Sequence, residues 1–344
     1  MVAVNDRPLT PAERAALFMQ NTRQHIIALP SRALPASSTV EFELPKVRLS
    51  SRILLEIQGT VGIGGTGTAT VNPYGAARFI RNLRVSINNG FNPYQISGRG
   101  LLVENMLMNL GLAETVVEQN VLGNTRGITT NPFSLYLEVP LTLNNRDPIG
   151  IINTANQQTS VTIVIDTGTL DSLFTTAETG LISDIRVIPH VESFSIPQNP
   201  QAIPDLSILK LTQEFSQTIP MAGEVTFDLQ TGLIYRKIIA LFETAAGEGM
   251  TLAQVGNLQL VLNQADIPYM VTPFVQRARN QRAYSHPLMD GVFVFDFTGE
   301  SQPNYGGRRD YIDTEQLTEF WLRTNTTVPG RLTVITQTLA RLGG

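Results

Sequence analysis

The segment Asn82-Leu83-Arg84-Val85-Ser86-Ile87-Asn88 recurs as Asn257-Leu258-Gln259-Leu260-Val261-Leu262-Asn263. We call the alignment that places Leu83 on Leu258 the repeat register. In both copies apolar side chains stand at every second position, which is the period of a β-strand with one buried face. The alignment continues without a gap, so that Pro93-Tyr94 aligns with Pro268-Tyr269. Turn-forming residues separate the two segments of each copy, so both copies are predicted to be strand-turn-strand units.

Other matches keep the same order along the chain. A predicted helix follows the strand-turn-strand unit in both copies, at 101–110 and at 274–284. Further matching segments are 40–44 with 225–229, 52–54 with 237–239, 135–139 with 293–297, 162–165 with 319–322, and 185–188 with 332–335. Amphipathic strands can resemble one another by chance, but the shared order favours a tandem duplication of one β unit.

The repeated unit is too large for an immunoglobulin-like sandwich. It has about eight predicted strands over roughly 150–170 residues, and an immunoglobulin-like sandwich has no helix within its strand series. A jelly roll fits this strand count better. The predicted fold is therefore all-β: two tandem eight-stranded jelly-roll sandwiches, a double jelly roll, with an N-terminal helix and a short helix in each sandwich.

A proline-rich segment between the copies predicts the domain boundaries. Three prolines fall within residues 197–204, which is the composition of a linker. We expect an N-terminal arm with a helix at 1–30, a first jelly roll at 31–196, a linker at 197–205 and a second jelly roll at 206–344.

The arm carries a specific helix-start signal. Thr10 is the candidate N-cap, Pro11 stands at the first helical position, and Glu13 completes a capping box. Leu17 and Phe18 give the predicted helix a modest apolar face. Two interpretations stay open: the helix docks on its own chain, or it serves as an assembly arm that holds a neighbouring subunit or a membrane surface.

Composition excludes several function classes. The chain has 344 residues, of which 42% are hydrophobic but only 16% charged, against about 25% charged in a typical soluble domain. The net charge of −4 disfavours direct, specific nucleic-acid binding, which needs a basic surface. There is no cysteine, so disulfides, thiolate metal sites and catalytic thiols are excluded. No signal peptide and no run of 18 apolar residues is apparent, so no membrane span is expected.

Motifs for chemistry are weak, and no catalytic residue, cofactor or metal site is predicted. His25, His190 and His286 lie far apart and have no partner at metal-ligand spacing. The glycine-rich segment 62–67 lacks the Gly-Lys-Ser/Thr ending of a phosphate-binding loop. Arg277, Arg279 and Arg282 are spread around the predicted helix, an arrangement that suits a solvated face or subunit pairing.

Short segments resemble the double jelly-roll major capsid proteins of tectiviruses, which are tailless icosahedral phages with an internal membrane. They are the helical start at 9–17, the strand ending at 139–141, the strand opening at 291–293 and the extended strand at 331–342. The resemblance covers most of the chain as an order of elements, but each segment is short and unspecific.

The resemblance implies a homotrimer in which six sandwiches form a pseudo-hexameric capsomer. Such trimers would tile an icosahedral shell around a membrane-enclosed double-stranded DNA genome. It further implies minor capsid and vertex proteins as partners, peripheral contact of the N-terminal region with the inner viral membrane, and assembly in the host cytoplasm. A chain poor in charge suits permanent subunit contacts.

Two alternatives come from other classes. One is a secreted two-sandwich carbohydrate-binding protein or glycosidase, which a single Trp and 7% aromatic residues support poorly. The other is a minor capsid or vertex protein, for which we expect elongated repeats or a trimerising stalk.

Overall fold

The computed structural model describes residues 9–63, 71–72, 75–108, 121–122, 129–144, 147–174, 182–263, 266–298 and 312–341. The elements up to β11 are α1 (Pro11–Asn21), β1 (Gln24–Ala28), β2 (Arg32–Ala33), β3 (Thr39–Glu43), β4 (Leu49–Ile63), α2 (Gly75–Arg78), β5 (Ile80–Ile87), β6 (Phe91–Ile96), α3 (Gly98–Met108), β7 (Val121–Leu122), β8 (Thr129–Pro140), β9 (Ile152–Asn153), β10 (Val161–Thr167), η1 (Leu170–Leu173) and β11 (Ile182–Phe194).

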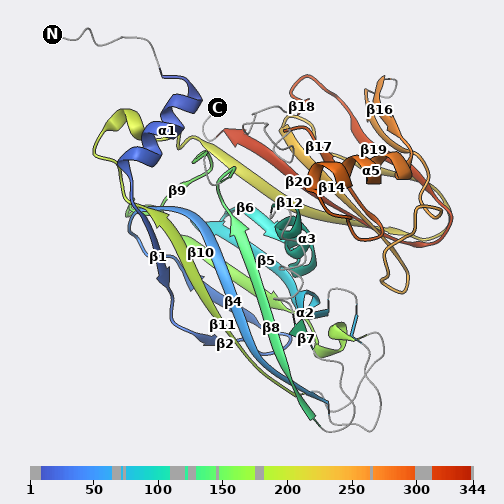
Figure 1. Cartoon of the computed structure of the whole chain (residues 1–344), viewed down its shortest axis with the longest axis horizontal. Coiled ribbons are helices and arrows are strands. Elements are labelled where there is room, and N and C mark those ends of the chain that lie inside the picture. The colour runs from blue at the N-terminus through green and yellow to red at the C-terminus, as the bar shows by residue number, and fades with distance from the viewer. Residues whose placement is uncertain are drawn as a thin grey trace.

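The remaining elements run from the connecting segment to the last strand. They are η2 (Pro200–Ala202), β12 (Ile208–Ile219), β13 (Gly223–Asp228), β14 (Ile234–Thr244), β15 (Leu258–Leu262), β16 (Asp266–Val271), α5 (Pro273–Tyr284), β17 (Val292–Asp296), β18 (Ile312–Asp313), β19 (Phe320–Thr326) and β20 (Gly330–Arg341). Figure 1 shows the first set in blue to yellow-green and the second mainly in yellow to red.

The first sandwich is formed by two antiparallel layers. One layer has the order β1-β11-β4-β8-β7, with β2 also on β11 and β9 on β4. The other has the order β3-β10-β5-β6. Strands that are distant in sequence are therefore neighbours in space, as a jelly roll requires.

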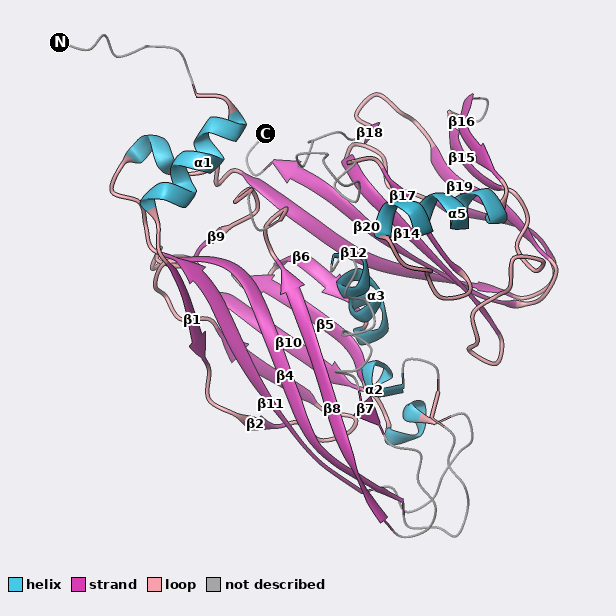
Figure 2. Cartoon of the chain, viewed as in Figure 1, coloured by secondary structure: helices cyan, strands magenta, loops and turns pink. Residues whose placement is uncertain are grey.

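The second sandwich repeats this order. One layer is β12-β20-β14-β17 and the other is β13-β19-β15-β16. Each strand has its counterpart: β12 matches β1 with β2, β20 matches β11, β14 matches β4, β17 matches β8, and the second layers match in the same way. The double jelly-roll prediction is confirmed, including a helix between the fifth and the sixth of the matched strands in each sandwich (Figure 2).

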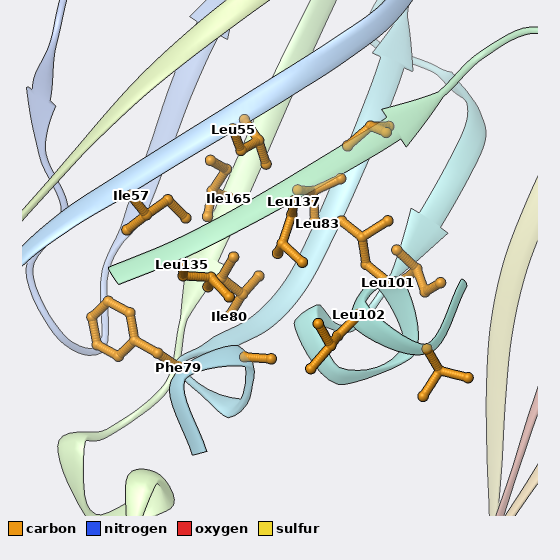
Figure 3. Close-up of a cluster of buried hydrophobic side chains, with 14 of the residues drawn as sticks. Leu55, Ile57, Phe79, Ile80, Leu83, Leu101, Leu102, Leu135, Leu137 and Ile165 are labelled. Carbon is orange, nitrogen blue, oxygen red and sulfur yellow. The ribbon is translucent and has the colours of Figure 1, made fainter. Parts of the chain in front are cut away.

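Each sandwich has its own core, and the first core extends into the second sandwich. In the first, Leu55 on β4 and Leu137 on β8 face Leu83 on β5, and all three are completely buried (Figure 3). Burying one such side chain contributes about 2 kcal/mol. Ile239 and Ile335, on β14 and β20, belong to this first cluster. The outer face of the second sandwich's sheet therefore packs against the first sandwich.

Several predicted boundaries differ from the observed ones. The predicted arm, residues 1–30, contains β1, which pairs with β11 along its whole length. The segment before β12 contains the short helix η2, which packs beside α1. The repeated segment 52–54 lies within β4, which extends over Leu49–Ile63. Gly62 of the glycine-rich segment therefore belongs to a strand, while residues 64–67 lie outside the described residues.

The helix predicted at 101–110 begins earlier, at Gly98. A Cβ at Gly98 would lie 2.3 Å from the Ala77 carbonyl oxygen, and one at Gly100 would lie 2.3 Å from a Glu214 carboxylate oxygen. Glycine permits these close approaches, and its low helix propensity hid the first turn from prediction. Residues 109 and 110, at the predicted end of this helix, lie outside the described residues.

Candidate functional site: the junction between the sandwiches and the outer sheet edges

The two sandwiches are joined by a parallel strand pair. β6, at the edge of the first sandwich, pairs with β12, at the edge of the second, through Tyr94 opposite Thr212 and Gln95 opposite Gln213. The pair merges two layers into one continuous sheet of order β17-β14-β20-β12-β6-β5-β10-β3. Helix α3 lies between the sandwiches beside this pair (Figure 2). We call this region the junction.

A buried carboxylate of α3 ties the first sandwich to two strands of the second. Glu104 is 1% exposed and accepts hydrogen bonds from Gln337 Nε2 at 2.5 Å and from the Tyr94 hydroxyl. Lys210 Nζ lies 3.4 Å from the same carboxylate and 3.4 Å from the Pro140 carbonyl oxygen. A buried charge is tolerated only where such partners compensate its lost hydration, so this cluster fixes α3 against β12 and β20.

In a second charged cluster at the junction, the carboxylates belong to the second sandwich and their partners to the first. Glu243 on β14 accepts from Arg78 Nη2 at 3.0 Å and is also paired with Arg99. Glu214 on β12 accepts hydrogen bonds from the Ser97 backbone N–H and from the Ser97 hydroxyl, both at 2.8 Å. Three carboxylates therefore bridge the sandwiches, and each is held by groups from the other sandwich.

The burial of these groups shifts their titration. Burial raises the pKa of Glu214, although the Ser97 hydrogen bonds and Arg99 act in the opposite direction. Burial and the neighbouring Glu104 carboxylate raise the pKa of Tyr94 well above its ordinary value. Tyr94 therefore stays a neutral donor to Glu104 throughout the physiological pH range. These charged groups serve the contact between the sandwiches and do not face an open cleft.

Two asparagines that the sequence analysis missed hold the helices in equivalent places. Asn105 on α3 donates to the Glu138 carbonyl oxygen and accepts from the Glu138 N–H, both at 2.7 Å. Asn280 on α5 makes the same reciprocal pair with Val294, at 2.7 and 2.9 Å. The helices thereby cover strand edges on β8 and β17 that would otherwise expose unpaired backbone groups. The two asparagines match in the repeat register, so extending the repeat into the helix would have found them.

The asparagines that end the repeated segment occupy matching turns. Asn88 and Asn263 both have positive φ, 51° and 47°, which asparagine tolerates better than most residues. The Asn88 side chain accepts from the Ser160 N–H at 2.8 Å, and that of Asn263 accepts from the Thr318 N–H at 2.9 Å. Each asparagine thus fixes the segment before the seventh strand of its sandwich.

Among the other residues of the repeated segment, the two leucines are alike and the rest differ between the two copies. Leu83 and Leu258 are completely buried, but Asn82 bonds to Asp166 whereas Asn257 is exposed. Pro93 and Tyr94 are buried at the junction, whereas Pro268 is exposed and Tyr269 half-buried on β16. The difference follows from the partner strand, because β12 covers β6 and no described strand covers the outer side of β16.

The N-terminal helix is capped as its sequence predicts. Thr10 accepts from the Glu13 N–H, Glu13 accepts from the Thr10 N–H at 2.9 Å, and Pro11 opens the helix. Phe18 is completely buried in a cluster with Leu49 and Ile151. Phe18 is thus engaged within its own chain, which leaves the half-buried Leu17 and the outer face of the helix for any assembly role.

A cavity of about 250 Å³ lies beside α1. Its lining includes Phe18, Arg52 and Glu192. Arg52 is paired with Glu138 at 2.6 Å, and Glu192 accepts from Ser51 at 3.2 Å. The charged groups of the cavity are therefore bound to protein partners.

The remaining candidate groups do not assemble into a site. His190 Nε2 lies 3.0 Å from a Glu56 oxygen, while the His286 ring contacts backbone carbonyl oxygens. Arg277 pairs with Asp290 on the exposed side of α5. Within the described ranges, no three His, Asp or Glu side chains gather as metal ligands would. None of the helices described combines the length and the apolar character that crossing a bilayer requires.

The fold of this chain is similar to that of several viral capsid proteins of known structure. The STIV major capsid protein superposes with a TM-score of 0.72 at 15% identity, covering 93% of this chain and 97% of that one. PBCV-1 VP54 gives 0.72 at 8% identity, covering 94% and 95%. The major capsid protein of Bacteriophage PM2 gives 0.60 at 12% identity, covering 93% and 98%.

At such low identities the similarity establishes the fold. The chain is a double jelly roll of the type found in these major capsid proteins, and the alignment extends over nearly all of each chain. No protein-family model matches the sequence, and a search of curated protein sequences finds no match either.

Proposed function

We propose that this chain is a major capsid protein that self-assembles into an icosahedral shell. The observation that carries the proposal is the pair of equivalent sandwiches locked together at the junction. Because the two sandwiches are alike and rigidly joined, three chains can present six similar units around one axis. A pseudo-hexameric trimer is therefore the capsomer that the fold supports best.

The similar structures favour the same role. They are capsid proteins from viruses that include Sulfolobus Turreted Icosahedral Virus and Bacteriophage PM2. Each aligns with more than nine-tenths of this chain, so the likeness involves both sandwiches and their mutual arrangement.

A structural and non-catalytic role agrees with the disposition of the charged groups. The two most buried carboxylates of the described residues, Glu104 and Glu243, are bound across the junction, and so is the half-buried Glu214. Paired carboxylates in an open cleft would instead favour the glycosidase alternative. The junction therefore uses its ionisable groups to join domains.

The resemblance to tectiviruses extends the proposal to the particle. We infer a shell around a membrane-enclosed double-stranded DNA genome, assembled in the host cytoplasm and completed by minor capsid and vertex proteins. The exposed face of α1, which includes Met19 at 44% exposure, is the part of the N-terminal region available to a neighbouring trimer or to the membrane surface.

Light scattering coupled to size-exclusion chromatography tests the proposal. A trimer has three times the chain mass of 37.7 kDa. A stable monomer at high protein concentration contradicts the capsid assignment. Protein stoichiometry in purified particles separates a major from a minor capsid protein, since a major subunit dominates the stained gel. Reproducible binding on a glycan array would instead support the carbohydrate-binding alternative.

A further inference from the structure

Two of the sheet edges that have no described partner are equivalent to the two edges that meet at the junction. β12 and β1 are the first edge strands of their sandwiches, and β6 and β16 are the edge strands of the second layers. Within the chain, β6 pairs with β12. The outer edges of β1 and β16 pair with no other strand in the part of the chain that the structure describes.

The strand pairing shows which residues of β1 match those of β12 that touch β6. Ile53 on β4 and Ile238 on β14 are completely buried residues of equivalent strands, and they match in the sequence repeat. Ile53 pairs with Val191 on β11, which lies opposite Ile27 on β1. Ile238 pairs with Thr336 on β20, which lies opposite Gln213 on β12. Through these pairings Ile27 matches Gln213, and Ile26 matches Thr212.

These matching positions differ sharply in exposure. Thr212 is completely buried because β6 covers it, whereas Ile26 and Ile27 are 56% and 36% exposed. An apolar pair on an open strand edge is a feature that monomeric proteins avoid. The first sandwich thus exposes isoleucine where the second sandwich has a buried contact.

The second sandwich also exposes apolar side chains, on β16 and α5. Met270 is 58% exposed, and Phe274 and Val275 are 70% and 45% exposed. In the repeat register, the last two match Arg99 and Gly100, which lie inside the junction against β12 and β14. The surface of β6 and α3 is therefore buried at the junction, whereas the equivalent surface of the second sandwich, on β16 and α5, is apolar and exposed.

Charge at the two edges is complementary. In the repeat register Glu104 matches Arg279, which is exposed and forms no ion pair with any described residue. Gln337, which donates to Glu104, lies opposite Thr212, and Glu192 lies opposite Ile26, the residue that the strand pairing matches to Thr212. An acidic group in the junction is thus replaced by a basic one on α5, and its neutral partner is replaced by an acidic one beside β1.

We propose that β16 and α5 of one copy bind β1 of a second copy, in the parallel arrangement that joins β6 to β12 within the chain. Tyr269 and Met270 then lie opposite Ile26 and Ile27 of the second copy. The contact is head-to-tail, so it leaves one edge available at each end until a ring closes. This inference rests on the proposed capsid function and names the surface through which subunits associate.

Disulfide trapping in the full chain tests this contact. The protein has no cysteine, so a chain carrying Ile27→Cys and Met270→Cys has no competing thiol. Neighbouring strands lie about 4.8 Å apart, a separation that a disulfide spans. The matched control carries Val47→Cys and Met270→Cys, because Val47 is 47% exposed and lies on neither edge.

We expect mild oxidation to convert the Ile27→Cys/Met270→Cys chain into covalent dimers and trimers that a reductant dissolves, and to leave the control chain monomeric on a denaturing gel. Failure to cross-link in a sample that light scattering shows to be trimeric overturns this contact and leaves the capsid function intact. Equal cross-linking of the control also overturns it. A monomer at every concentration overturns both proposals.

A charge substitution gives an independent readout. Met270→Glu should raise the dissociation constant of the assembly at least tenfold, since it places a charge in the strand contact. Met221→Glu is the control, because Met221 is 72% exposed and lies in the turn between β12 and β13, outside β1, β16 and α5. An unchanged dissociation constant for Met270→Glu would contradict the proposed contact.

Discussion

Replacing Lys210 with methionine should destabilise the whole chain by removing one partner of a buried ion pair at the junction. Only 5% of the Lys210 side chain and 1% of the Glu104 side chain are exposed, and their charged atoms lie 3.4 Å apart. Breaking a buried pair from one side costs about 3–5 kcal/mol, because a buried charge loses its compensation. Gln337 still donates to Glu104 at 2.5 Å, so we expect the lower end of this range, about 3 kcal/mol.

Equilibrium unfolding in guanidinium, followed by circular dichroism, measures this loss. The control is Arg277→Met, which breaks a pair whose side chains are 34% and 54% exposed. Exposed pairs contribute under about 1 kcal/mol. Combining Lys210→Met with Glu104→Gln should cost less than the sum of the single changes, because the second change removes the charge that the first one leaves unpaired. A Lys210→Met loss as small as the control's would refute our account of the junction.

Three further predictions concern separate parts of the fold. Thr10→Ala should cost about 1 kcal/mol and speed amide exchange in the first turn of α1; unchanged exchange would contradict the cap. Asn280→Ala should cost about 1–3 kcal/mol, since it leaves the buried Val294 N–H without its partner, while Gln276 still donates to the Val294 carbonyl oxygen. Asn257→Ala, at an exposed position, should be close to neutral in the same unfolding assay. Glu214 has an ordinary pKa of 4.5 that folding raises, so its ionisation opposes folding above that pH. The free energy of unfolding of Glu214→Gln should therefore increase relative to that of the natural chain as pH rises from 4 to 8. A difference that stays constant over this pH range would contradict this prediction.

The strand content follows directly from sequence, because one buried face per strand imposes a period of two. Leu83 and Val85 are completely buried, and so is Leu258, which matches Leu83 in the repeat register. The helix cap is likewise local, since Thr10 and Glu13 contact each other within one turn. Such features depend on neighbours in sequence, which a pattern records.

The junction could not be predicted in the same way. Lys210 and Glu104 are 106 residues apart, and only the arrangement of both sandwiches brings them together. The parallel pair of β6 with β12 involves two residues of each strand, which is too short to leave a pattern. Taken singly, Asn105 and Asn280 look like surface residues in a sequence, and only their match in the repeat register indicates a shared role.

The start of the first sandwich was missed for a related reason. β1 is exposed along almost all of its length, so it lacks the alternation that identifies a half-buried strand. Its membership of the sheet depends on pairing with β11, the last strand of the first sandwich. If a second copy covers β1, its isoleucines gain the burial that the single chain does not provide.

Electron microscopy of the purified full-length protein tests the central claim most directly. Our account predicts class averages with six similar lobes around a threefold axis, two lobes for each chain. Particles that show only two lobes at every concentration, or rings with any other number of chains, would contradict it.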